Sequence, residues 1–344
     1  MKKRKRTSYK GKRQAFTNRP IKERFYTKED VFVSRMASIL MVPKGKIPWL
    51  FSQRPITTIR LNSLKGDIDD TKAELIKRGY DLREIPWSKD TYFVLNKDKA
   101  EVSQTEMYTD GKYYIQNLSS ILATLVLDPK EKETILDLCA APGSKTTHIA
   151  DVTRNKATVI ANDIDMGRIS DLQSVVDQFG AKVKVTLSDG KEFGKNYPVY
   201  FDKVLLDAPC SGEGLIYFKN GDPLRFWSMD KVKRSMFEQK ELIESAFKSL
   251  KHGKYMVYST CTLEPEENEG VLTHLLKTFP NAAKIEKINI KSDIFKSTPE
   301  LKQHIKPGIT KWSGNVYDSQ VRNAIRIVPN KMMMGFFIAK ISKE

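Results

Sequence analysis

The residues best suited to chemistry in this chain of 344 residues are two of its three cysteines. Cys210 lies in the segment DAPCSGEG (207–214) and Cys261 in YSTCTLEPEENE (258–269), each directly after an apolar run that predicts a strand. Small or polar neighbours flank both thiols, which favours a reactive role over inert packing. An ordinary thiol, with a pKa of about 8.5, is mostly protonated at neutral pH, so nucleophilic attack needs an activating environment.

The cysteine count also limits the other roles of these side chains. Three cysteines cannot all pair, and none lies in a CxxC spacing. This pattern argues for a reducing compartment and against a structural zinc site. His148 and His252 have no companion at metal-ligand spacing, so we predict that the chain holds no metal.

A third stretch, DLCAAPGSKT at 137–146, predicts the end of a buried strand, a tight turn and the start of a helix. Pro142 and Gly143 break the strand, and Thr146 and Thr147 can cap the helix. Such a turn leaves backbone N–H groups free to hold a polar or anionic group. The stretch is not a P-loop, because no Gly-Lys-Ser/Thr run follows a first glycine at the required interval.

Acidic residues follow the ends of two further predicted strands. Asp163 closes the strand 157–162 and lies 20 residues after Gly143, where an acid takes the ribose hydroxyls of a nucleoside cofactor. Asp189 follows the strand 182–187, and an acid there can accept the adenine amino group. Ligands sit beyond the carboxyl ends of the strands in a doubly wound sheet, so both acids fit one ligand. Arg168 would help to hold Asp163 or the cofactor.

Together, 137–146, 207–214 and 258–269 resemble the Sun/Nop family of RNA cytosine-5 methyltransferases. The resemblance covers residues 111–340 and, more loosely, the region before them. One departure is Ser144, where the family more often carries a second glycine, but serine is also small. The resemblance implies a Rossmann-like class I methyltransferase that uses S-adenosylmethionine. The cofactor-binding residues are then Cys139, Ala140, Ala141, Pro142, Gly143, Ser144, Lys145, Asp163, Arg168, Asp189 and Asp207.

Methylation at carbon 5 of cytosine explains why the chemistry would need a thiolate. Carbon 5 is a poor nucleophile until a thiolate adds to carbon 6 and places electron density on carbon 5, and loss of the carbon-5 proton then expels the enzyme. In the family resembled, the cysteine of the TC motif attacks and that of the PC motif helps to release product. These roles fall on Cys261 and Cys210. DNA cytosine methyltransferases use the PC cysteine instead, so the assignment rests on the resemblance.

Two further side chains complete the predicted catalytic set. Asp207 is the natural acid to reach N3 and the exocyclic amine of the base, either as a protonated donor or by accepting the amine hydrogens. The sequence does not choose between these states. Lys145 would bond the carbonyl oxygen of the base or stabilise the thiolate. Cys139 belongs to the cofactor turn and is expected to contribute packing or backbone contact only.

The elements that must position these residues alternate helix and strand from residue 111 onward. This alternation predicts an α/β fold, a doubly wound and mostly parallel sheet, within a methyltransferase domain at 111–344. The last apolar run, 335–341, has no helix after it, so we expect it to return antiparallel. Residues 292–325 have no clear pattern.

A smaller unit is predicted before the catalytic domain. Residues 21–110 contain a helical pattern over 25–42 and then a β-α-β-β order, which indicates a small α+β RNA-binding domain of the RNA-recognition type. Residues 1–20 form a basic tail that we expect to be disordered. Up to Asp30 the chain has 12 Lys or Arg against 3 acids, about +9 of the formal net charge of +17. Such a tail is attracted to phosphates.

Composition narrows the class of protein. An apolar fraction of 40 % supports a folded core, no apolar run approaches the roughly 18 residues of a membrane span, and no signal-peptide pattern opens the chain. We expect a monomer without membrane contact that acts on structured tRNA or rRNA. We expect it in the cytoplasm, or in the nucleus or nucleolus if the organism has one, given the basic run 2–6.

Two alternatives stay open. One is a non-catalytic RNA-binding ribosome-assembly factor with the same fold, against which the joint presence of both cysteines, Asp207 and Lys145 argues. The other is a DNA cytosine-5 methyltransferase, against which the small N-terminal domain argues. A nucleotide hydrolase is contradicted by the missing P-loop spacing.

Overall fold

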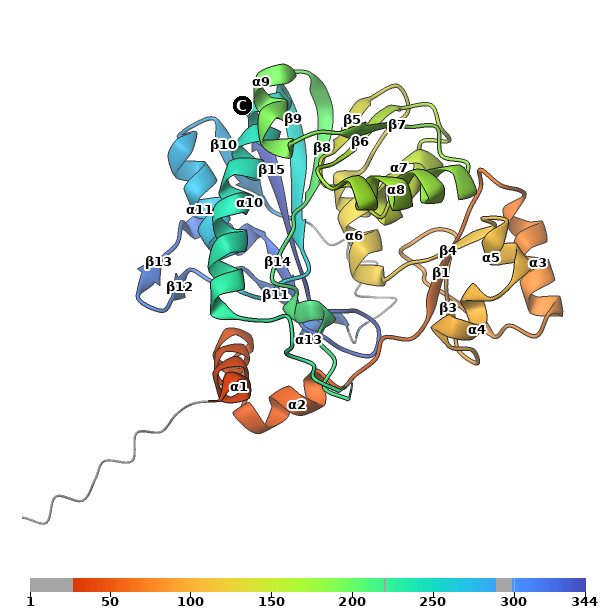
Figure 1. Ribbon diagram of the computed structural model, residues 1–344, viewed down its shortest axis with the longest axis horizontal. Helices are drawn as coiled ribbons and strands as arrows, with labels where there is room; N and C mark the ends of the chain where they lie inside the picture. The colour runs from red at the N-terminus through yellow and green to blue at the C-terminus, as the bar shows by residue number, and fades with distance from the viewer. Residues whose placement is uncertain (1–26, 220, 289–298, 300) are drawn as a thin grey trace, which may run out of the picture.

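The computed structural model describes residues 27–219, 221–288, 299 and 301–344, and Figure 1 shows a large sheet with helices on both faces beside a smaller sheet. The predicted tail, residues 1–20, lies outside the described residues. The large sheet contains β5 (Thr134–Asp137), β6 (Thr158–Asp163), β7 (Lys184–Leu187), β8 (Phe201–Asp207), β9 (Leu250–Thr260), β10 (Ala283–Glu286), β11 (Ile305–Pro307), β14 (Ile325–Ile327) and β15 (Phe336–Lys343).

The strand order of the large sheet is β11-β14-β15-β9-β8-β5-β6-β7, with β10 also pairing with β15. The strands from β9 to β7 are parallel, and β15 runs antiparallel to β9. The predicted doubly wound sheet and its antiparallel last strand are therefore confirmed. Residues 292–325, which the sequence left unplaced, contribute β11, the short ribbon β12 (Lys311–Trp312) and β13 (Asn315–Val316), and the first residue of β14.

Helices cover both faces of this sheet because its strands are apolar on both sides. In β5, Leu136 faces the cluster under α9, α10 and α11, whereas Ile135 faces the cluster under α6 and α7. The helices of this part are α6 (Leu118–Leu127), α7 (Ser144–Val152), α8 (Met166–Gln178), α9 (Phe193–Asn196), α10 (Met229–Ser249), α11 (Glu269–Thr278) and α13 (Leu301–His304), with the 3₁₀ turns η2 (Gly190–Glu192), η3 (Glu213–Leu215) and η4 (Ser319–Asn323).

The smaller sheet is antiparallel, in the order β2-β3-β1-β4. Its strand β4 lies beyond residue 110, where the sequence ends the first domain, yet it pairs with β1 and so belongs to the smaller sheet. The elements of this unit are β1 (Thr58–Leu61), α3 (Ile68–Lys77), β2 (Leu82–Glu84), β3 (Thr91–Val94), α4 (Lys99–Ser103), α5 (Glu106–Thr109) and β4 (Tyr113–Ile115).

The first helices pack on the large domain and not in the core of the small sheet. These are α1 (Lys28–Leu40), the 3₁₀ turn η1 (Lys44–Lys46) and α2 (Ile47–Leu50). Phe32 of α1 is fully buried, and its ring meets Trp227 edge to face with centroids 5.1 Å apart. The apolar stripe of α1 predicts that one face is buried, but stripe residues do not specify what they contact. The segment 28–51 therefore falls outside the small α+β unit expected over 21–110.

A buried ion pair holds the small sheet against the methyltransferase sheet. Arg60 of β1 is 2 % exposed and pairs with Asp151 of α7. Its Nε also donates to Gln116 at 3.1 Å, and Gln116 donates in turn to the carbonyl of Ser144 at 3.1 Å. The small domain thereby contacts the helix that begins at the predicted cofactor turn.

Candidate active site

The two cysteines of the long motifs meet at the ends of adjacent strands. β8 and β9 pair in parallel, with Asp207 opposite Ser259, so the loops that follow them leave the same edge of the sheet. The Sγ atoms of Cys210 and Cys261 lie 3.1 Å apart, well beyond a disulfide bond length, and both cysteines are free thiols. The pairing of β8 with β9 therefore brings these two thiols together.

The environment of the thiols differs between the three cysteines. The pKa of Cys210 is raised well above its usual value by its hydrogen bond with Cys261, then by burial, and then by the carboxylates of Glu267 and Glu213. Cys210 therefore retains its proton at neutral pH and can donate it to Cys261. Burial, followed by the nearby charge of Asp163, raises the pKa of Cys139. Cys139 is consequently a poor nucleophile, as expected for a packing residue.

Lys145 and Asp207 form a pair beside the thiols. Lys145 Nζ donates to Asp207 Oδ2 at 2.5 Å, and Ser259 Oγ donates to Asp207 Oδ1 at 2.6 Å. Lys145 comes from the first turn of α7 and is 8 % exposed, whereas Asp207 ends β8. With a cation on one oxygen and a hydroxyl on the other, Asp207 is held as a carboxylate.

The turn before α7 has the local conformation that the sequence predicts, although the helix starts earlier. Gly143 is the N-cap residue at φ 106°, a left-handed conformation that favours glycine, and no side chain caps the first turn. A Cβ at this position would lie 3.0 Å from side chains of Leu172 and Val175. Thr146 and Thr147, expected to be caps, are buried inside the helix because α7 begins at Ser144. The first N–H groups of α7 remain open to a ligand.

Asp163 is buried at the end of β6 and braces the turn. Its carboxylate accepts hydrogen bonds from the backbone N–H groups of Ala141 and Asp165, both at 3.2 Å. Arg168 pairs with Asp163 at 3.3 Å and donates to the Ala141 carbonyl at 2.6 Å. Arg168 therefore holds Asp163, one of the two roles that the sequence left open for it.

Asp189 lies at the end of the neighbouring strand. It caps η2 by accepting the N–H of Lys191 at 3.0 Å, and β7 before it pairs in parallel with β6 so that Leu187 faces Asp163. The N–H of Ser188 donates to the Asp163 carbonyl at 3.2 Å. Strand pairing thus brings Asp189 to the same edge of the sheet as Asp163.

Asp137, which the sequence analysis does not select, is a buried acid beneath the turn. It is 1 % exposed, its Oδ2 accepts from Thr146 Oγ1 at 2.7 Å, and its Oδ1 has no partner among the described residues. Burial raises the pKa of Asp137 to about 7. A buried oxygen without a partner next to open amides of α7 fits a bound polar group. The position of Asp137 in the 137–146 motif is the sequence feature that could have identified this residue.

One cavity of about 630 Å³ connects the turn with the thiols. It is lined on one side by Ala141 and Arg168 and on the other by Cys210 and Cys261. Asp163, Asp189 and Lys145 are not among the lining residues. The predicted site residues that line this cavity are Cys139, Ala141, Pro142, Arg168, Asp207, Cys210 and Cys261.

Two buried acids behind the thiols are a second feature that sequence reasoning missed. Glu213 and Glu267 are fully buried, and the hydroxyls of Ser211 and Thr262 lie between their carboxyl groups, each bonding to both. Trp227 Nε1 donates to Glu213 at 2.6 Å. These bonds tie the loop that carries Cys210 to the loop after Cys261. Sequence reasoning could have selected these two acids, because Glu213 lies in the SGEG segment after Cys210 and Glu267 in the LEPEENE segment after Cys261.

This carboxyl pair has a strongly perturbed titration. Burial, followed by the proximity of Glu213, raises the pKa of Glu267 to about 8. Glu267 therefore holds a proton at neutral pH. The loops of both cysteines are therefore fastened by a network that is protonated under ordinary conditions.

Comparison with known proteins places the chain in a family. The family described as "16S rRNA methyltransferase RsmB/F" matches residues 124–342. The chain belongs to this RsmB/F family. A tRNA (cytosine(49)-C(5))-methyltransferase of Pyrococcus abyssi is 40 % identical over 298 residues, which cover 86 % of this chain and 91 % of that relative.

Other relatives agree with this membership. The ribosomal RNA small subunit methyltransferase F of Shewanella oneidensis is 37 % identical over 84 % of this chain, although the match spans only 58 % of that longer protein. A methyltransferase homologue of Pyrococcus horikoshii has a similar structure, with a TM-score of 0.76, 30 % identity, and coverage of 93 % of this chain and 96 % of its own. The resemblance drawn from the three motifs and the expected Rossmann-like methyltransferase fold are confirmed.

Two general features bear on the site. Within the described ranges no group of three or more histidine, cysteine or acidic side chains is arranged to hold a metal ion. Across the same residues, every helix is too short or too polar to span a bilayer.

Proposed function

We propose that this chain is an S-adenosylmethionine-dependent RNA (cytosine-5)-methyltransferase that works through a covalent adduct between Cys261 and carbon 6 of the base. The observation that carries the proposal is the pair of thiols, 3.1 Å apart, in a cavity that also reaches the turn before α7. A methyltransferase that needed only a bound cofactor would not need two facing thiols at the mouths of adjacent strands. Family membership supports both the activity and the cofactor.

We assign different roles to the two thiols because Cys210 holds a proton and is hydrogen-bonded to Cys261. Cys210 keeps its proton because it bonds to Cys261 and lies near Glu267. Donation from Cys210 stabilises negative charge on Cys261 Sγ, which is the state that attacks carbon 6. A bond then forms between Sγ and carbon 6, and carbon 5 gains the electron density with which it takes the methyl group. The carbon-5 proton then passes to water, its bonding electrons re-form the double bond between carbon 5 and carbon 6, and the bond from Sγ to carbon 6 breaks. Cys261 leaves as a thiolate, which the proton of Cys210 stabilises.

Asp207 orients the base in this proposal. Its pairing with Lys145 favours a carboxylate, so it accepts hydrogen bonds from the exocyclic amine of cytosine and does not donate to N3. Lys145 Nζ lies 2.5 Å from that carboxylate, which lines the cavity, and would bond the carbonyl oxygen of the base. The Lys145 contact lowers the energy of the negatively charged ring that attack by the thiolate creates, whereas the Asp207 contact holds the base in place.

S-adenosylmethionine supplies an electrophilic methyl group when it is bound. To hold it, the chain offers the open amides at the start of α7 and the strand-end acids Asp163 and Asp189. Asp137 adds its Oδ1, which has no hydrogen-bond partner among the described residues. Asp163 would meet the ribose hydroxyls and Asp189 the adenine amine. Arg168 keeps Asp163 in place. Residues 139–145 form the wall of this site.

The substrate class that we propose is structured RNA, either tRNA or rRNA. The relatives named above act on each of these, and the chain spans only part of the rRNA enzyme. The small antiparallel sheet, now bounded at residue 115, would act as the RNA-binding appendage, and the basic tail 1–20 would add affinity. We propose that the protein acts as a monomer in the cytoplasm.

The test is methyl transfer by the purified chain to unmodified tRNA and small-subunit rRNA transcripts, followed by mass spectrometry of the nucleosides. 5-Methylcytidine should appear with the wild-type chain and with Ser174→Ala, a control on the exposed face of α8, and should be absent with Cys261→Ala. Methylation of DNA alone would favour the DNA enzyme. Tight RNA binding without methylation of any transcript would favour the non-catalytic assembly factor.

A further inference from the structure

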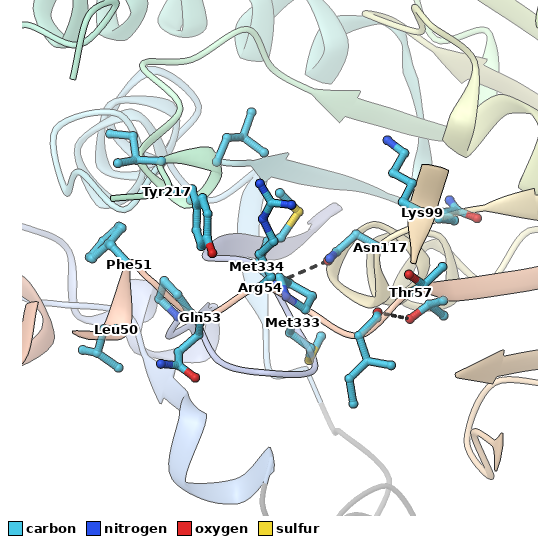
Figure 2. A pocket seen from close by; sticks show the side chains of 18 of the residues that line it. Leu50, Phe51, Gln53, Arg54, Thr57, Lys99, Asn117, Tyr217, Met333 and Met334 are labelled. Atoms are coloured by element: carbon cyan, nitrogen blue, oxygen red, sulfur yellow. Dashed lines mark hydrogen bonds between the residues drawn. The ribbon is translucent and has the colours of Figure 1, made fainter. Parts of the chain in front are cut away.

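A second cavity lies beside the catalytic one and has no role in the chemistry above. It measures about 350 Å³ and is enclosed by residues 50–58, by the edge of the small sheet, and by the loops 214–217 and 329–334. Figure 2 shows Tyr217 and Arg54 on one side of it and Lys99 and Asn117 on the other. Three residues, Leu215, Ile216 and Tyr217, line this cavity and also the catalytic cavity.

The partition between the two cavities is unusual for a protein surface. Leu215, at the end of η3, is 57 % exposed although it is large and apolar. Leu215 comes directly after the segment 210–214, which begins at Cys210. The N–H of Gly214 in this segment donates to the Cys261 carbonyl at 2.8 Å. An exposed apolar side chain on a rigid ridge suits contact with a nucleobase or sugar. The ridge therefore separates two neighbouring groups of one ligand.

The lining of the second cavity favours a nucleotide. The guanidinium carbon of Arg54 lies 4.5 Å from the centre of the Tyr217 ring, which makes a stacked, flat wall. The floor is apolar, with Ile115 and Met333 among its residues, and Lys99 is an exposed cation at the rim. Among the described residues that line it, none is acidic. Aromatic rings, Arg planes and cations without competing carboxylates are the groups that hold unstacked RNA bases.

A third cavity extends the same track away from the thiols. It measures about 330 Å³ and shares Leu50, Gln53, Ile56 and Pro329 with the second. Arg83 and Lys331 line it, and no acidic residue does so among those described. Cations thus line both of these adjoining cavities, as expected where a phosphate backbone is bound.

We propose that the second cavity holds a nucleotide next to the target cytosine in the same RNA strand, splayed from it across the Leu215 ridge and stacked on Tyr217. This inference rests on the proposed function, because it places the target base in the catalytic cavity. It adds that the RNA must be single-stranded around the target when it reacts, since neighbouring bases in a duplex cannot enter two separate cavities.

The experiment starts from a synthetic RNA that covers a site methylated by the wild-type chain, with each flanking position made abasic in turn. One neighbouring abasic position should lower kcat/KM about tenfold or more, the effect expected when a base–aromatic stack is lost. Tyr217→Ala should lower kcat/KM similarly on intact RNA and show no further loss with that abasic RNA. Tyr217→Phe, which keeps the ring, should behave like the wild type.

A second pair of variants keeps the proposal testable if Tyr217→Ala misfolds. Lys99→Glu changes an exposed residue in the first turn of α4, where an acid favours the helix, and should weaken RNA binding and reduce the salt slope by about one. Lys182→Glu, at an exposed position before the edge strand β7, reverses the same charge outside these cavities and should have a smaller effect.

The outcomes separate this inference from the proposed function. If no RNA is methylated by the wild-type chain, the proposed function fails and this inference fails with it. If RNA is methylated but the abasic effects are the same in the wild type and Tyr217→Ala at every position, only the second nucleotide site is overturned. Equal effects of Lys99→Glu and Lys182→Glu would overturn it as well.

Discussion

The Sγ atoms of Cys210 and Cys261 lie 3.1 Å apart although 51 residues separate them in the chain. Each thiol follows a strand of the parallel pair β8 and β9, so the contact is a consequence of strand order and register. The pKa of Cys210 is raised, first by its hydrogen bond with Cys261 and then by burial. Cys210 therefore presents a protonated thiol to Cys261, an arrangement that agrees with attack by Cys261.

The first prediction concerns the two thiols. Cys261→Ala should abolish turnover and leave no covalent adduct with RNA that contains 5-fluorocytosine, because no thiolate reaches carbon 6 and the fluorine cannot be lost. In the Cys210→Ala variant, Cys261 should still attack carbon 6 and the methyl group should still be transferred. The reaction should then stall on ordinary RNA, before the enzyme is expelled. Denaturing electrophoresis would show this stalled species as a protein–RNA adduct, and digestion would show a methylated base within it.

The pattern of adducts decides the assignment. An adduct from Cys261→Ala and none from Cys210→Ala would exchange the two roles. The absence of any adduct between the intact enzyme and the fluorinated RNA, with binding demonstrated, would remove covalent catalysis from the mechanism.

The second prediction tests the proposed ribose contact. Asp163→Ala should weaken binding of S-adenosylmethionine by at least ~1 kcal/mol, the typical cost of a lost buried hydrogen bond, or about fivefold in Kd. Isothermal titration calorimetry measures this change. Asp171→Ala, on the exposed face of α8, is the matched control and should bind as the wild type does. Equal affinities of the two variants would place the ribose elsewhere.

The third prediction is a pH dependence of stability. The pKa of Glu267 rises from 4.5 to about 8 on folding, so the folded chain binds this proton more tightly than the unfolded chain. Its contribution to the free energy of unfolding is complete below pH 4.5 and is lost as the pH rises towards 8 and beyond, by up to about 1.4 kcal/mol per pH unit. The groups facing it are Glu213, Cys210 and the hydroxyl of Ser211.

Urea unfolding of Glu267→Gln between pH 6 and 9 checks this dependence. The variant should lose the downward slope with pH that Glu267 imposes, because an amide does not titrate. Glu238→Gln removes a carboxylate from an exposed position of α10 and should keep the wild-type slope. Parallel curves for the wild type and Glu267→Gln would show that Glu267 is ionised in the folded chain throughout this range.

The fourth prediction concerns a buried ion pair that supports the loop after Cys261. Arg326 of β14 is 1 % exposed, donates to both carboxylate oxygens of Glu269 at 2.6 and 2.7 Å, and bonds the carbonyl of Leu263. Arg326→Met leaves a buried carboxylate without its partner and should cost about 3–5 kcal/mol of stability.

Two further variants make the measurement specific. The double variant Arg326→Met with Glu269→Leu should recover much of the loss in urea unfolding, because no isolated charge remains. Arg78→Met breaks an exposed pair with Glu74 on α3 and should leave the stability nearly unchanged. A double variant less stable than Arg326→Met alone would mean that the pair itself is strongly stabilising.

The fifth prediction concerns the basic tail. Deletion of residues 1–20, which contain nine Lys or Arg and no acid, should weaken RNA binding mainly at low salt and flatten its salt dependence, because fewer counterions are released. Filter binding across a range of salt concentrations measures both quantities. A shift of the methylated cytosine on deletion would show that the tail selects the target.

Local patterns were sufficient for the main elements of the catalytic domain. The apolar runs before Cys210 and Cys261 predicted strands, and the structure pairs these strands in parallel, so that both thiols leave the same edge of the sheet. The sequence also predicted the turn at Gly143, because the residues of a tight turn determine its conformation. The start of α7 was placed two residues late because threonine is a good cap and the glycine cap was not recognised.

Other features depended on which distant segments meet. The weak pattern over 292–325 concealed β11, which pairs with β14. No local pattern shows that Arg326 of β14 is buried in an ion pair with Glu269. The pairing of β4, which lies beyond residue 110, with β1 of the smaller sheet joins segments about 55 residues apart. Nothing in the spacing of Glu213 and Glu267 shows that they share two hydroxyls.

The sequence by itself thus determined the chemistry that is available: two thiols, a lysine and strand-end acids, each positioned by its own short motif. The tertiary structure alone decided how these groups act on one another. The proton of Cys210, the carboxylate of Asp207 and the second cavity beside Tyr217 all arise from contacts between remote segments. Such contacts are set by strand order and by burial, and these depend on the packing of the whole chain and not on any local run of residues.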